Sequence, residues 1–125
     1  MRFMLTSVSL DPGNPAPTPE LFAALGKLTE EMTSTGKLVE GGGMGMRSTR
    51  VTLTGGEIVV DAPFAEAKEV VGGYAVVQVA SHDEAIEMAR RFLDLHRRIL
   101  GSSYRAENEI RRLYGPWDAP EGSRG

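Results

Sequence analysis

The sequence has no cysteine among its 125 residues, which excludes disulfides, cysteine metal ligands and a cysteine nucleophile. It also has no apolar run near the ~18 residues that a membrane span requires, so contact with a membrane is not expected. Polar residues, Thr6 and Ser7, follow the first five positions, and the apolar core of a secretory signal is therefore missing. We expect the protein to be cytoplasmic.

Strong charge of one sign is also missing. The formal net charge is −3, with 14 Lys and Arg against 17 Asp and Glu, so a nucleic-acid partner is not expected. A hydrophobic fraction of 41% and a charged fraction of 25% are ordinary for a folded chain. The length predicts a single domain over residues 1–118, with a polar tail at residues 119–125.

The first half of the chain alternates between strand and helix patterns. Residues 2–10 predict a strand, and the proline-rich segment 11–19 predicts a loop. Thr18 is a suitable N-cap for a helix that ends at Gly36. That helix carries one apolar stripe, formed by Leu21, Leu25, Leu28 and Met32.

Glycine is concentrated just after that helix. Four glycines fall within residues 41–45, which predicts a kinked or bulged strand over residues 37–46. A phosphate-binding loop is the weaker interpretation, because no Lys-Ser/Thr pair and no helix start follow the glycines. Next, Gly55-Gly56 predicts a hairpin turn between two short strands. The segment Asp61-Ala62-Pro63-Phe64 is expected to break the returning strand.

The second half repeats the strand–helix–strand order. Residues 74–79 form the most apolar segment and predict a central strand. Ser81 and Glu84 form a capping box for a helix that ends at Gly101, and residues 109–114 predict a last strand. Without the hairpin, the order is the β-α-β-β-α-β pattern of a ferredoxin-like α+β sandwich.

Two helices cover only one face of such a sheet. We therefore expect a homodimer, in which a second copy covers the other face. The side chains expected on the covered surface are those of Phe3 or Leu5, Val51 and Val77.

Five segments of the chain carry a likeness to one family: Asp61-Ala62-Pro63-Phe64-Ala65-Glu66-Ala67-Lys68-Glu69, Gly72-Gly73-Tyr74, Met1-Arg2-Phe3-Met4-Leu5, Gly36-Lys37-Leu38 and Glu109-Ile110-Arg111. Through these segments the chain resembles the YCII-related, or DGPF-domain, family. The resemblance implies a dimeric α+β barrel, in which two ferredoxin-like halves pack sheet to sheet. Some relatives are similar to small enzymes with a His–Asp pair, and others occur beside sigma factors of the extracytoplasmic-function type.

Three positions depart from the family pattern. Ala62 replaces the glycine of the signature, Gly42 replaces an acidic residue after the first helix, and no histidine precedes His82. Because Ala62 precedes proline, extended geometry is expected there, and glycine is not required.

The signature loop is the first candidate site. Asp61 and Glu66 are candidate proton acceptors of a catalytic site, with Lys68 as counter-charge. Lys68, Phe64 and Tyr74 are candidate ligand-binding residues. The alternative, which we favour slightly, is that Asp61 caps its own turn and that Lys68 pairs with a neighbouring carboxylate in solvent.

His96 is the third candidate catalytic residue. It lies partly on the apolar stripe of the second helix and could face a cavity as an acid–base group. A hydrogen-bonded packing role is the commoner one for such a histidine, and His82 is expected at the surface. The two histidines, fourteen positions apart, do not converge on a metal. No metal and no cofactor are expected.

Arginines are concentrated between residues 90 and 112. They are Arg90, Arg91, Arg97, Arg98, Arg105, Arg111 and Arg112. A solvated surface with local ion pairs is the better interpretation, because no nucleic-acid-binding pattern accompanies them. Our main hypothesis is a homodimer with a pocket for a small organic molecule near residues 61–64, with enzymatic activity left open. The alternative is a regulatory module that binds a transcription-related protein.

Overall fold

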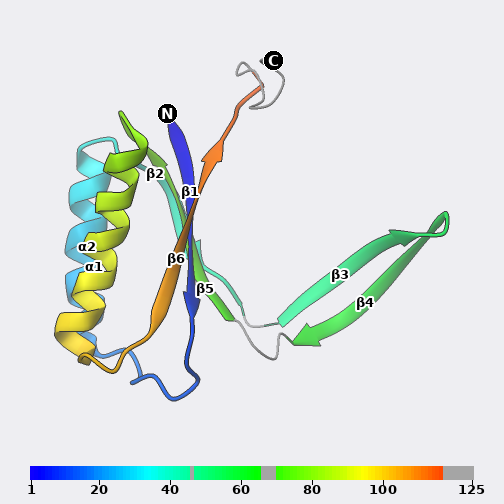
Figure 1. Cartoon of the computed structure of the whole chain (residues 1–125), viewed down its shortest axis with the longest axis horizontal. Helices are drawn as coiled ribbons and strands as arrows, with labels where there is room; N and C mark the ends of the chain where they lie inside the picture. The colour runs from blue at the N-terminus through cyan, green and yellow to red at the C-terminus, as the bar shows by residue number, and fades with distance from the viewer. Residues whose placement is uncertain (46, 66–69, 117–125) are drawn as a thin grey trace.

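The computed structural model describes residues 1–45, 47–65 and 70–116. Within these residues the chain forms two helices and six strands (Figure 1). In chain order they are β1 (Arg2–Ser9), α1 (Pro19–Ser34), β2 (Leu38–Gly43), β3 (Arg47–Thr54), β4 (Glu57–Ala65), β5 (Val70–Gln78), α2 (His82–Leu100) and β6 (Ala106–Leu113). This order confirms the predicted succession of elements.

Four of the strands form one antiparallel sheet in the order β2-β5-β1-β6. Strand β5 is an interior strand, as its apolar sequence predicted. Both helices lie on the same face of this sheet (Figure 1). The arrangement is consistent with a ferredoxin-like fold, with the β3–β4 hairpin inserted between β2 and β5.

Local sequence signals determine where each helix begins and ends. The Thr18 hydroxyl accepts a hydrogen bond from the Leu21 N–H at 3.2 Å, and the Ser81 hydroxyl accepts one from the Glu84 N–H at 3.2 Å. Each bond satisfies a backbone donor that the first helical turn leaves free. Helix α1 ends before Gly36, which has φ 75°, a left-handed conformation that favours glycine.

The core lies between the sheet and helix α2. Phe3, Leu5 and Val77 are buried there against Ala85, Met88 and Ala89 of the helix. The prediction that Phe3 or Leu5 and Val77 lie on a surface covered by a second copy is therefore wrong. The alternation of the strands was predicted correctly, but pattern alone does not say which of two apolar faces the helices cover.

The other face of the sheet has no helix layer over it (Figure 1). Register partners of Met4 are Val76 on β5 and Arg111 on β6, and Thr6 pairs with Tyr74. Directly paired residues share a face of the sheet, so this face carries an apolar centre with charged residues at its edge. No helix among the described residues is long and apolar enough to cross a membrane.

The β3–β4 hairpin is a separate two-stranded sheet that projects away from the helix–sheet body (Figure 1). Its turn residues have positive φ, 58° at Gly55 and 78° at Gly56, as a two-residue hairpin turn requires. Cross-strand pairing places four apolar side chains on one face of the hairpin, all of them exposed: Val51, Leu53, Ile58 and Val60. Nothing within the described residues covers this face.

The segment Asp61–Phe64 does not break strand β4, which corrects the expected turn. The strand continues to Ala65, with Ser48 opposite Phe64 and Arg50 opposite Asp61. Two residues of β4 thus oppose one residue of β3, which is a β-bulge. A bulge tolerates proline because the extra residue makes no ladder hydrogen bond.

Candidate ligand-binding cavity

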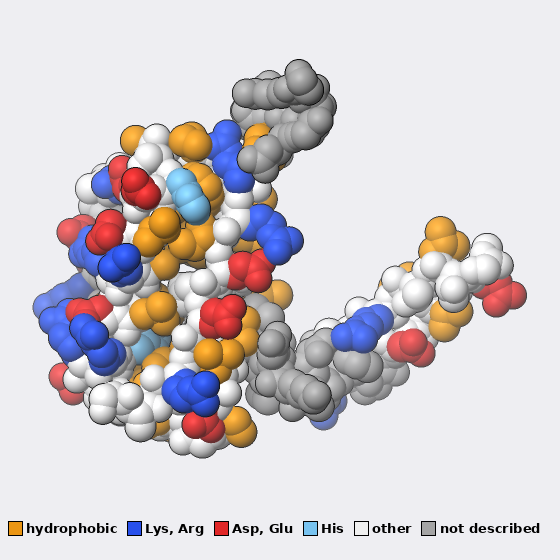
Figure 2. Space-filling view, viewed as in Figure 1, with side chains coloured by type: hydrophobic (Ala, Val, Ile, Leu, Met, Phe, Trp, Pro, Cys, Tyr) orange, Lys and Arg blue, Asp and Glu red, His pale blue; other side chains and the backbone are white. Residues whose placement is uncertain are grey.

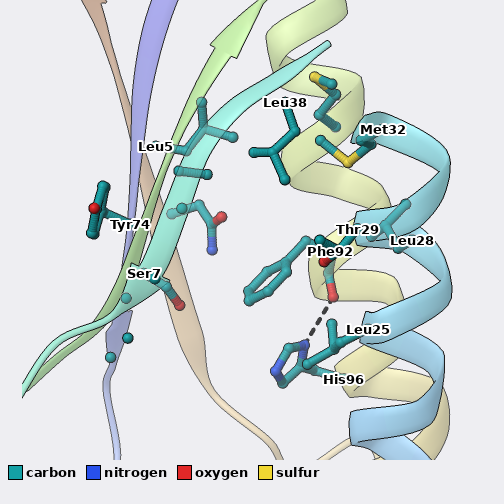
Figure 3. Close-up of a pocket in the computed structure, with 18 of the residues that line it drawn as sticks. Leu5, Ser7, Leu25, Leu28, Thr29, Met32, Leu38, Tyr74, Phe92 and His96 are labelled. Atoms are coloured by element: carbon teal, nitrogen blue, oxygen red, sulfur yellow. Dashed lines mark hydrogen bonds between the residues drawn. The ribbon is translucent and has the colours of Figure 1, made fainter. Parts of the chain in front are cut away.

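A cavity of about 650 Å³ lies between the two helices and the sheet. Its walls come from helices α1 and α2, from strands β1, β2, β5 and β6, and from Pro17 and Tyr104 in the connecting segments. Figure 3 shows Phe92 and His96 projecting from α2 toward the sheet, with Leu5 and Ser7 of β1 opposite. The volume lies within the range of ordinary small-molecule sites.

The side chains on the floor become smaller along the sheet. Three rows of register partners run across the four strands, in the order β2, β5, β1, β6. They are Leu38, Val77, Phe3 and Arg112; then Gly41, Ala75, Leu5 and Ile110; then Gly43, Gly73, Ser7 and Asn108. The last row has no large apolar side chain, so the space under the helices is left open there.

Two glycines of this last row differ in how close the neighbouring backbone comes. A Cβ at Gly73 would lie 2.9 Å from the Gly42 carbonyl oxygen, whereas a Cβ at Gly43 would meet no atom nearer than the Gly72 oxygen at 3.8 Å. Gly73 is therefore required by the close approach of β2 and β5. Gly43 is not required by packing, and it leaves room that belongs to the cavity.

The roof is apolar. It consists of the predicted stripe of helix α1, Leu21, Leu25, Leu28 and Met32, together with Met88 and Phe92 of α2. Two other lining residues of α1, Phe22 and Thr29, are exposed, so we place the mouth of the cavity between α1 and β2. Figure 2 shows apolar side chains along the boundary between helices and sheet on the viewed face.

His96 is the one buried polar or charged residue among those described, with 7% of its surface exposed. Its Nδ1 lies 2.9 Å from the Phe92 carbonyl oxygen (Figure 3). A carbonyl oxygen can only accept, so Nδ1 carries the proton and donates it. In the neutral ring Nε2 is then an acceptor, and no described residue forms a hydrogen bond with it.

Tyr104 packs against the same histidine. The two rings are stacked with centroids 5.1 Å apart, and the centroids of the Phe92 and His96 rings are 4.5 Å apart. Burial raises the pKa of the Tyr104 hydroxyl above its usual value, because the phenolate would lose solvation there. The hydroxyl therefore stays protonated at neutral pH.

Asn108 and Ser7 are neighbours in the polar row of the floor. The Asn108 Nδ2 atom is buried and has no hydrogen-bond partner among the described residues. A buried donor without a partner is unfavourable by about 1–3 kcal/mol, so a partner supplied from within the cavity would be stabilising.

The residues proposed from sequence fall into three groups. His96 lines the cavity, and so does Tyr74 at its edge, but the Tyr74 ring points away from the helices (Figure 3). Asp61 is exposed on the hairpin and is absent from the cavity lining. Phe64 pairs through its backbone in β4, and its side chain lies outside the described residues. Glu66 and Lys68 also lie outside them, so their roles stay predictions.

The arginine-rich segment forms local ion pairs. The Arg98 Nε atom lies 2.9 Å from Asp94 Oδ2, and the Arg90 Nε atom lies 3.4 Å from Glu87 Oε1. Arg91 pairs with Glu31 of the other helix. These charges are partly neutralised in solvent, as the favoured interpretation predicted. Arg112 departs from that prediction, because its Nε and Nη1 atoms are buried without a hydrogen-bond partner among the described residues. Among the described residues, no three His, Asp or Glu side chains are grouped so that they could hold a metal ion.

Residues 1–92 match the family of the YCII-related domain. The chain belongs to this family. The match confirms the resemblance inferred from the sequence, and it covers the chain from β1 to the middle of α2. No curated protein matches the chain. His96, Tyr104 and Asn108 lie beyond the matched residues of the YCII-related domain, so the polar end of the cavity is argued from the structure alone.

Sequence reasoning missed Ser7, Tyr104 and Asn108 as cavity residues. Ser7 follows the apolar Phe3 and Leu5 on one face of β1, and Asn108 lies between Ala106 and Ile110 on one face of β6; these polar positions were the available signal. They indicate a site only when the register is known, because Ser7 and Asn108 are about a hundred positions apart in the sequence.

Proposed function

We propose that this YCII-related protein binds a small organic molecule in the cavity between its helices and its sheet. One observation supports this most directly: a cavity of about 650 Å³ lies beneath apolar helix faces, and one row of its floor consists of small and polar residues, Gly43, Gly73, Ser7 and Asn108. Convergent polar groups at one end of an apolar pocket are typical of ligand sites.

The cavity is bordered by the exposed α1 residues Phe22 and Thr29 and is therefore not a closed void in the core. Because the cavity opens to solvent, water fills it when no ligand is present. A ligand that displaces poorly ordered water from apolar walls gains affinity.

The same proposal leaves room for an enzyme. His96 presents an unprotonated Nε2 at the cavity, and histidine is the side chain best suited to exchange a proton near neutral pH. In an enzyme, His96 would remove a proton from the bound molecule or return one to it. Asp61, Glu66 and Lys68 of the signature stay predictions from sequence, and Asp61 does not line this cavity.

We also propose that the protein works as a homodimer. The dimeric barrel implied by the family, the open face of the sheet and the apolar face of the hairpin support this. A two-stranded hairpin is marginal in water by itself, and exposed patches of several hundred Å² commonly mark interfaces. A second copy would cover both surfaces.

Binding of the neutral fluorescent dye N-phenyl-1-naphthylamine tests the proposed cavity. Gly43→Leu places a large side chain on the cavity face of β2 and should weaken binding by roughly tenfold or more, about 1.4 kcal/mol. Gly42→Leu is the matched control: Gly42 borders the cavity, but a Cβ there would meet the Tyr74 ring at 3.5 Å, and that ring points away from the helices. It should bind dye as the unaltered protein does. Equal binding by all three proteins would refute the proposal, because the dye would then lie elsewhere, such as on the hairpin.

A further inference from the structure

The cavity lining contains a donor, Asn108 Nδ2, and an acceptor, His96 Nε2 of the neutral ring, and neither has a hydrogen-bond partner among the described residues. We infer that the ligand is an uncharged, mainly hydrocarbon molecule with a carbonyl-type oxygen that accepts from Asn108 and a hydroxyl or N–H group that donates to His96. This inference rests on the proposed function and specifies the class of molecule that the cavity takes.

The Asn108 side chain selects for an acceptor. Its Nδ2 is buried without a partner among the described residues, and it lies in the row that leaves the cavity open. A site built to hydrogen-bond a ligand discriminates against analogues that lack the matching group, because the buried polar group then stays unpaired.

The His96 side chain selects for a donor. Its Nδ1–H donates to the Phe92 carbonyl oxygen, so in the neutral imidazole Nε2 carries a lone pair and no proton. The stacked Tyr104 ring and the tilted Phe92 ring both contact the imidazole and restrict its orientation. Nε2 is therefore a fixed acceptor, and a ligand hydroxyl or amide N–H satisfies it.

The absence of charge along the walls selects against ionised ligands. No Lys, Arg, Asp or Glu occurs among the lining residues, all of which lie in the described part of the chain. Arg112 lies two register rows from Asn108 on strand β6. Its guanidinium lies over the Phe3 and Tyr114 rings, and its Nε and Nη1 atoms are buried without a hydrogen-bond partner among the described residues. Because Arg112 does not line the cavity, an anion bound beside Asn108 and His96 would lose water without a directly paired cation, which is unfavourable.

Three naphthalenes of similar size test these selections on the full chain: 2-acetylnaphthalene, 2-naphthol and 2-naphthoate, measured by fluorescence titration at pH 7. We expect the two neutral compounds to bind roughly tenfold tighter than the carboxylate, or more. This comparison needs no variant, so it stands even if a substitution impairs folding.

Two near-isosteric variants then separate the two hydrogen bonds. Asn108→Leu should weaken the binding of 2-acetylnaphthalene by about tenfold and change the affinity for 2-naphthol by no more than about twofold. His96→Phe keeps an aromatic ring at this position but removes Nε2. It should weaken the binding of 2-naphthol and leave the affinity for 2-acetylnaphthalene nearly unchanged.

Two results would overturn the inference: 2-naphthoate binding as tightly as the neutral compounds, or either variant weakening both neutral probes equally. If N-phenyl-1-naphthylamine still distinguishes Gly43→Leu from Gly42→Leu, the proposed cavity stands and only the ligand class is wrong. If that distinction also fails, the proposed function itself is wrong.

Discussion

Gly43 and Gly73 are register partners on adjacent strands, and replacing each by alanine should have opposite effects. Neither has a positive φ, so backbone conformation does not forbid alanine at either position. At Gly73 the new Cβ would lie 2.9 Å from the Gly42 carbonyl oxygen, a contact so short that strand β2 must shift. Overpacking of this kind destabilises by about 1–3 kcal/mol.

At Gly43 the nearest atom to the new Cβ is 3.8 Å away, an ordinary contact. Alanine there restricts the unfolded chain and should stabilise the protein by about 0.4–1 kcal/mol. Urea unfolding followed by far-ultraviolet circular dichroism measures both free energies. Equal changes for the two variants, or a larger loss for Gly43→Ala, would refute the assignment of a close strand approach at Gly73 and open space at Gly43.

Four further predictions concern the buried core, the N-cap of α2, the Tyr104 hydroxyl and the dimer. Leu21→Ala should lower the free energy of unfolding by about 2–5 kcal/mol, because the Leu21 side chain is only 1% exposed. Leu53→Ala should leave the free energy of unfolding of the monomer nearly unchanged, because Leu53 is 72% exposed. Ser81→Ala removes the cap of α2 and should cost about 0.5–2 kcal/mol, measured by thermal unfolding. Tyr104 has a raised pKa in the folded state, so folding stability should be full below the usual tyrosine pKa, near pH 10, and fall as the pH rises through the folded value; Tyr104→Phe should remove that part of the loss. Light scattering should return a dimer mass, and Leu53→Asp should shift it toward 13.5 kDa; a monomer at micromolar concentration before any substitution would contradict the dimer.

The elements were predictable because their signals are local. The N-cap residues Thr18 and Ser81, the helix-ending Gly36 and the hairpin turn at Gly55-Gly56 each act within a few residues of their own position. The structure has these boundaries as predicted.

The error at Asp61–Phe64 shows where local signals stop. Proline was expected to end strand β4, but Pro63 lies at a bulge opposite β3, where its missing N–H is tolerated. Whether such a segment turns or bulges depends on its neighbouring strand, which the local pattern does not specify.

The cavity was less predictable for a related reason. It exists because Gly43, Gly73, Ser7 and Asn108 come into one row across four strands. Each residue alone is an unremarkable interruption of a strand pattern. Only the register of pairing turns them into the floor of a site, and register depends on the whole sheet.

The most direct test of the cavity is the position of a bound probe. Nuclear magnetic resonance of protein labelled at its Leu, Val and Met methyl groups, with 2-acetylnaphthalene added, reports which methyls lie against the ring through intermolecular Overhauser effects. The cavity predicts contacts with methyls of Leu25, Leu28 and Met32, which line it. Contacts confined to Val51 and Leu53 of the hairpin, or contacts with no methyl of the cavity, would contradict the proposed site.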